Sequence, residues 1–76
     1  MHSLGGIRSG VRATIATIPQ DRDLAAELAA LGILPGEDIE VVQATPFHGP
    51  ILIRTSGGLY AVGRTLADRI VVTMHP

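Results

Sequence analysis

The chain has 76 residues, no cysteine, a net charge of −1 and a mean hydropathy of +0.35. The lack of cysteine excludes disulfides, thiolate metal sites and a cysteine nucleophile, and the near-neutral charge lacks the basic signature of nucleic-acid or anionic-lipid binders. No apolar run approaches the roughly 18 residues of a membrane span, so we expect one small cytoplasmic domain over residues 1–76, its core at about 4–73.

The first predicted element is a strand over residues 11–18, after a short glycine-containing lead-in at residues 1–10. Its apolar residues alternate with polar ones such as Arg12 and Thr14, as expected for a half-buried strand. A helix then runs to Leu31. Either Asp21 or Asp23 caps it, because each would place a carboxylate near the positive helix end.

The end of this helix carries the clearest local signals. Gly32 can adopt the left-handed conformation that closes a helix, and Ile33 falls where an apolar side chain folds back onto Leu28. Pro35 cannot continue the helix, and Gly36 permits a turn. The segment is therefore a fixed corner that leads into the next strand.

The rest of the chain predicts short strands separated by turns. The predicted strands are 39–45, 51–55, 59–63 and 70–73. Ser56-Gly57-Gly58 indicates a tight hairpin, and Thr65–Asp68 indicates a single helical turn that Thr65 caps. Five short strands with closely spaced turns favour a small, mainly β barrel or sandwich.

Few residues suggest catalysis or metal binding. The histidines are His2, His48 and His75, and we interpret them as solvated side chains without a ligand role. The paired carboxylates are explained by turn and cap preferences, and no nucleophile motif is present. The chain has no lysine and therefore no P-loop. We predict no enzymatic activity, no cofactor and no resident metal.

Five residues are candidates for contact with a protein partner: Leu34, Phe47, Ile51, Arg54 and Arg64. Leu34 lies outside the apolar stripe of the helix, so it faces elsewhere, toward a partner or a second copy. Phe47 either plugs the end of the barrel or forms an exposed anchor, and the core position is favoured. The arginines form either a solvated outer face or the polar rim of an interface.

Several segments together resemble a known family. They are Gly10…Ala13…Ile15, LAALGILPG (28–36), IEVV (39–42), FHGPILI (47–53), YAVGR (60–64), Ala67 and IVV (70–72). In this order the chain resembles FeoA-type proteins, small cytosolic accessory proteins of bacterial ferrous iron uptake, over roughly 4–73. The resemblance implies an SH3-like barrel with an added helix. It also implies a role in binding or regulating the cytosolic GTPase domain of the membrane ferrous iron transporter FeoB.

The expected architecture is a five-stranded SH3-like barrel, with one α-helix after the first strand and a short helical turn before the last. The expected function is that of a non-enzymatic module that binds and modulates the FeoB GTPase domain, without membrane insertion. A homo-oligomer is compatible with the sequence. The alternatives are a nucleic-acid-binding small barrel, which the charge and 3% aromatic content disfavour, and a metal-sensing or oligomerisation domain related to iron-dependent repressors.

Overall fold

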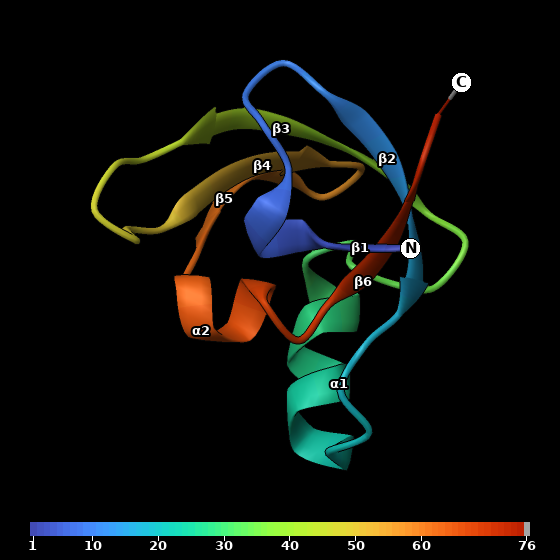
Figure 1. Cartoon of the computed structure of the whole chain (residues 1–76). Helices are drawn as coiled ribbons and strands as arrows, with labels where there is room; N and C mark the ends of the chain where they lie inside the picture. Colours follow the sequence, from blue (N-terminus) through green and yellow to red (C-terminus); the bar gives the residue numbers. More distant parts are fainter. Residues whose placement is uncertain (76) are drawn as a thin grey trace.

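The structure is a computed structural model and describes residues 1–75 (Figure 1). Its elements in chain order are β1 (His2–Ser3), the 3-10 helix η1 (Leu4–Gly6), β2 (Arg12–Thr17), α1 (Arg22–Ala30), β3 (Asp38–Ala44), β4 (Ile51–Thr55), β5 (Gly58–Val62), α2 (Arg64–Ala67) and β6 (Val71–Met74).

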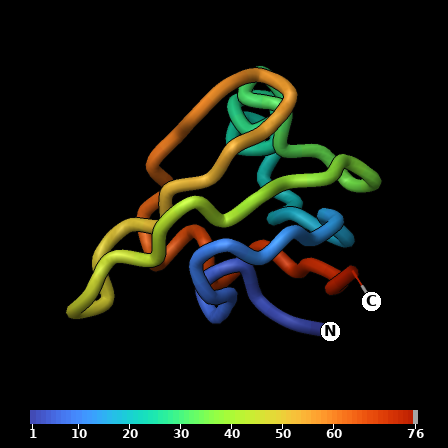
Figure 2. Tube along the Cα trace, turned by 90° about the horizontal axis from the view of Figure 1, so that it is seen from above, coloured from blue at the N-terminus to red at the C-terminus, as the bar shows by residue number. Residues whose placement is uncertain are grey.

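All strands belong to one antiparallel sheet with the order β1-β6-β2-β3-β4-β5. The pairing of β2 with β6 shifts between Ile15 and Thr17, and that of β3 with β4 shifts between Val41 and Gln43. Each shift inserts one extra residue into a strand, and such bulges bend strands and increase their twist. The sheet therefore curls, with α1 and α2 below it (Figure 1), and the first and last strands, β1 and β6, pair with each other (Figure 2).

The curled sheet encloses one aliphatic core. Its buried members are Leu4, Ile7, Ala13, Ile15, Leu28, Ile33, Ile39, Val41, Ile51, Ile53, Val62, Ala67, Ile70 and Val72. The single phenylalanine is absent from this set, and the single tyrosine, Tyr60, packs only at its border. Branched aliphatic side chains fill the interior, as expected for closely spaced short strands.

Both ends of α1 follow from local sequence. Asp21 is the N-cap, and its carboxylate accepts a hydrogen bond of 2.9 Å from the Leu24 amide, which resolves the choice between the two aspartates. At the other end Gly32 has φ = 85°, and the Ile33 amide donates to the Leu28 carbonyl at 2.8 Å. This is the Schellman closure that the sequence predicts, with Ile33 and Leu28 both buried.

The hairpin between β4 and β5 packs against the C-terminal end of α1. The buried Thr55 hydroxyl donates to the Leu31 carbonyl and accepts a bond of 3.0 Å from the Gly57 amide. A Cβ on Gly57 would lie 2.8 Å from the Leu31 carbonyl oxygen, so only glycine allows this approach. Thr55 thereby satisfies one of the carbonyl groups that a helix end leaves without a partner.

The fold confirms the predicted mainly β class, with one helix between strands and a short helix before the last strand. It differs in having a sixth strand, β1, where the sequence predicts only a lead-in. Leu4 is fully buried and its amide donates to the Ile70 carbonyl at 2.7 Å, which holds β1 against β6. The predicted cap of α2 is wrong: Gly63 is the N-cap, and no side chain caps this helix.

Candidate protein-docking site

The loop between β3 and β4, residues 45–50, projects from the body of the protein in both views (Figures 1 and 2). We call it the docking loop. Phe47 lies at its centre and is 100% exposed. The expectation that Phe47 joins the core is therefore wrong, because the loop turns away from the sheet before the phenylalanine.

The backbone of the docking loop adopts an unfavourable conformation at two adjacent residues. Phe47 has φ = 58° and His48 has φ = 60°, and no other residue except glycine has a positive φ among residues 1–75. For an ordinary L-residue the left-handed region costs roughly 1–2 kcal/mol. Strain of this kind persists only where surrounding contacts impose it, and such strain is concentrated at functional sites.

Hydrogen bonds within the loop impose this conformation. The Thr45 hydroxyl donates to the Pro50 carbonyl at 2.7 Å, and the Gly49 amide donates to the Pro46 carbonyl at 3.1 Å. A Cβ on Gly49 would clash with the Thr45 hydroxyl and lie 3.0 Å from the Pro46 carbonyl oxygen. Glycine at position 49 is therefore required for the tight closure.

Arg64 fixes the docking loop to the body of the protein. It is the first residue of α2 and is half buried. Its Nε donates to the Gly49 carbonyl at 3.0 Å and its guanidinium NH2 group donates to the Thr45 carbonyl at 3.1 Å. Bonds from a charged donor are stronger than neutral ones. Arg64 therefore links the docking loop to α2 through two hydrogen bonds.

A second link joins the loop to the segment that follows α2. His48 Nε2 lies 3.6 Å from Asp68 Oδ2, and both side chains are substantially exposed. Asp68 in turn packs closely against Gly5, where any Cβ would collide with its carboxylate. This contact places the His48 imidazole beside the C-cap residue of α2.

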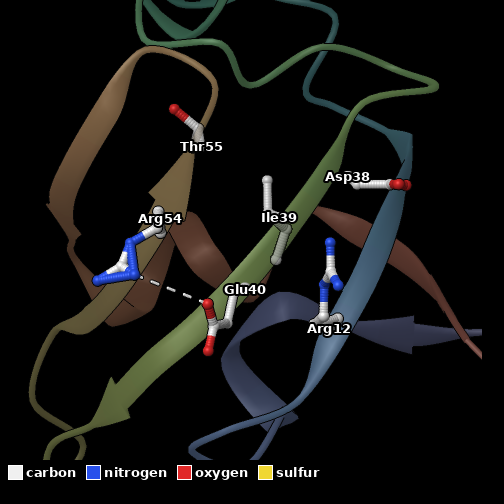
Figure 3. A pocket seen from close by; sticks show the side chains of 6 residues that line it. All are labelled: Arg12, Asp38, Ile39, Glu40, Arg54 and Thr55. Atoms are coloured by element: carbon white, nitrogen blue, oxygen red, sulfur yellow. Dashed lines mark ion pairs between the residues drawn. The ribbon is translucent and has the colours of Figure 1, made fainter.

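Arg54 lies on a different face, on the outside of the sheet. The strand register places Arg12, Glu40 and Arg54 in one row across β2, β3 and β4. Arg54 is 3.8 Å from Glu40, and the row borders a surface depression of about 180 Å³ (Figure 3). Two arginines thus share a face, but a carboxylate stands between them, so the row is not a uniformly basic patch.

A small polar cluster lies beside this row. The Thr14 hydroxyl donates to Asp38 Oδ1 at 2.7 Å and is 2.9 Å from His75 Nε2, which lies 3.4 Å from Asp38 Oδ1. The hydrogen bond from Thr14 holds the pKa of the Asp38 carboxyl below its usual value, with His75 and Arg12 adding to the effect. The same His75 nitrogen faces both partners, so the three groups do not form a catalytic relay.

The remaining predicted contact residues lie apart from the docking loop's tip. Leu34 is in the turn between α1 and β3 and is 38% exposed, so part of its side chain is available to a partner. Ile51 is fully buried in the core and presents no surface. The structure thus brings Phe47 and Arg64 together at one loop and leaves Leu34 and Arg54 on separate faces.

Among residues 1–75, no three histidine or acidic side chains lie close enough together to hold a metal ion. Within the same residues, none of the helices has the length and apolar character needed to cross a membrane. The contacts His48–Asp68 and His75–Asp38 each bring one histidine and one carboxylate together.

The FeoA domain family model matches residues 2–74. A crystal structure of an iron uptake regulatory protein, FeoA, is 29% identical, with a TM-score of 0.86 and 96% of each chain covered. An iron(II) transport protein A from Clostridium thermocellum is 30% identical, with a TM-score of 0.85, covering 95% of this chain and 44% of that one. A manganese-dependent transcriptional repressor, 24% identical, shares the fold with a TM-score of 0.85, over 97% of this chain and 41% of its own. No curated protein matches the chain.

Proposed function

Because this chain belongs to the FeoA domain family, we propose that it binds the cytosolic GTPase domain of the membrane ferrous iron transporter FeoB and modulates it. The family is associated with iron(II) transport and is a non-enzymatic accessory domain. The proposed action is therefore protein contact in the cytoplasm, with no bond made or broken by this chain.

The docking loop is the observation that supports a contact function most directly. A fully exposed aromatic side chain on a braced, strained loop has no role in the packing of this fold. Aromatic residues and arginine are enriched where proteins bind one another, and a few such residues supply most of the binding free energy.

Modulation requires that the chain bind the states of the GTPase domain unequally. A binding partner shifts an equilibrium only by the difference between its affinities for the two states. A tenfold preference for one nucleotide state corresponds to about 1.4 kcal/mol and changes the ratio of the two states tenfold at saturation. The proposal therefore includes an affinity that depends on the bound nucleotide.

Isothermal titration calorimetry tests this function. The full chain is titrated into the soluble GTPase region of FeoB, which is loaded with GDP, loaded with a non-hydrolysable GTP analogue, or left nucleotide-free. We expect saturable one-to-one binding with affinities that differ between these forms, and no binding to an unrelated GTPase domain of similar size. Absence of binding to all three forms, or equal binding to the unrelated domain, contradicts the proposal.

A further inference from the structure

We propose that the docking loop inserts Phe47 into an apolar pocket on the GTPase domain, and that Arg64 is the positioning residue that holds the loop for this insertion. This inference rests on the proposed function and names the part of the chain that makes the contact. It is carried by three observations: the exposure of Phe47, the conformation of its backbone and the bracing of the loop.

Folding does not explain an aromatic residue at position 47. The side chain is 100% exposed and therefore contributes no burial to the core. Its φ of 58° is one that glycine or asparagine adopts at lower cost. A residue that is unfavourable for both packing and backbone is better explained by an interaction that the isolated chain lacks.

The loop is already ordered in the free protein, which favours tight binding. Arg64 contributes two hydrogen bonds to the loop carbonyls, and the Thr45 hydroxyl contributes a third that joins the two ends of the loop. Ordering a flexible loop on association costs free energy, and a preorganised one avoids most of that cost. Phe47 is thus displayed at a fixed place relative to the sheet.

The chemistry of the loop tip defines the pocket that fits it. Pro46 precedes Phe47 and Pro50 ends the loop, and both prolines are at least partly exposed, while the exposed His48 lies within 3.6 Å of Asp68. Phe47 and Pro46 therefore present apolar surface with polar groups beside it. The complementary surface is a cavity of aromatic size lined by apolar side chains, with polar groups around its rim.

Two other occupants fit less well. A second copy of this chain would have to receive Phe47 in a cavity, but the depression on its outer face is lined by Arg12, Asp38, Glu40 and Arg54 together with Ile39 and Thr55. Four of these six residues are charged, which does not favour an aromatic ring. A lipid surface is also disfavoured, because peripheral binding needs several apolar residues and a basic surround, whereas the chain has a net charge of −1 and Asp68 lies beside the loop.

The test compares Phe47→Ala with a matched control, Leu59→Ala, in the calorimetric titration above. Leu59 is also an exposed apolar residue, on β5 and away from the loop. We expect Phe47→Ala to weaken binding at least 30-fold, equivalent to about 2 kcal/mol, and Leu59→Ala to change it less than threefold. Circular dichroism melting curves of each variant establish that the fold is retained.

Arg64→Met tests the positioning role separately. It removes the hydrogen bonds to the loop but leaves Phe47 in place, so we expect weaker binding with a less favourable binding entropy. Arg64→Lys, which keeps the charge but lacks the forked donors, is expected to restore little of the affinity. Unchanged affinity and entropy in Arg64→Met contradict the positioning role.

The outcomes separate this inference from the proposed function. Wild-type binding with unchanged affinity in Phe47→Ala overturns the inference and leaves the function standing. No wild-type binding overturns both, because the inference commits to this partner. Phe47-dependent dimerisation in analytical ultracentrifugation, or Phe47-dependent binding to vesicles of phosphatidylglycerol and phosphatidylethanolamine, also overturns it in favour of that occupant.

Discussion

Replacing Phe47 by glycine should stabilise the free protein, although it removes an aromatic side chain. The left-handed conformation at φ = 58° costs an ordinary residue roughly 1–2 kcal/mol and costs glycine almost nothing. Glycine also raises the entropy of the unfolded chain, which opposes folding by about 0.5–1 kcal/mol. The side chain is 100% exposed, so no burial is lost. We therefore expect the free energy of unfolding of Phe47→Gly to exceed that of wild type by about 0.5–1 kcal/mol.

Urea and thermal unfolding followed by far-ultraviolet circular dichroism measure this gain. For a chain of this size about 1 kcal/mol corresponds to roughly 4–8 °C in Tm, so we expect a rise of roughly 2–8 °C for Phe47→Gly. Phe47→Ala keeps the unfavourable backbone and should lie within about 0.5 kcal/mol of wild type. If Phe47→Gly is no more stable than Phe47→Ala, the strain at position 47 does not exceed the entropic cost of glycine, and the estimate of roughly 1–2 kcal/mol is refuted.

Three further predictions concern the body of the fold and its titration. Gly32→Ala should destabilise the folded protein by at least about 1–2 kcal/mol, because φ is 85° and the new Cβ would lie 2.9 Å from the Thr55 hydroxyl oxygen. An unchanged midpoint of urea unfolding would contradict the role of Gly32 in the helix closure. Thr55→Val should lower the free energy of unfolding by about 1–3 kcal/mol, because it leaves the Leu31 carbonyl without a hydrogen-bond donor. Thr55→Ser should retain most of that free energy. Equal losses of stability in both variants would show that the hydroxyl is not responsible. Thr14→Val should raise the pKa of Asp38 toward its ordinary value in a carboxyl NMR titration. Because the pKa of Asp38 is lower in the folded state, the stability that Asp38 contributes is present above its unfolded pKa and is lost as the pH falls through its folded pKa. Wild type should therefore lose more stability on acidification than Thr14→Val. Parallel plots of stability against pH for the two proteins would contradict this.

The parts of the fold that the sequence predicts well are those set by neighbouring residues. The closure at Gly32, the cap at one of two aspartates and the hairpin after Thr55 each depend on side chains within a few positions, and each is found. Strand β4 also has its predicted bounds, Ile51–Thr55, because a turn signal stands at each end.

The features that the sequence does not predict depend on residues distant in the chain. The two residues of β1 become a strand only because β6 lies beside them. The sequence predicts Arg64 only as a solvated or interface-rim arginine, and folding brings its Nε within 3.0 Å of the Gly49 carbonyl oxygen. The positive φ of Phe47 has no local signal, since glycine or asparagine would be expected there. The loop of residues 45–50 turns away from the sheet, which leaves Phe47 fully exposed. The candidate site therefore emerges mainly from the tertiary structure.

Insertion of Phe47 into an apolar pocket on the GTPase domain would move its side chain from water into an apolar environment. The chain has no tryptophan, so Phe47→Trp introduces a single reporter at the tip of the docking loop. Its fluorescence is measured as a difference spectrum during titration with the GTPase domain, with calorimetry establishing that the variant binds. We expect a blue shift of the emission and protection from iodide quenching at saturation. Saturable binding with an unshifted, fully quenchable emission would contradict it.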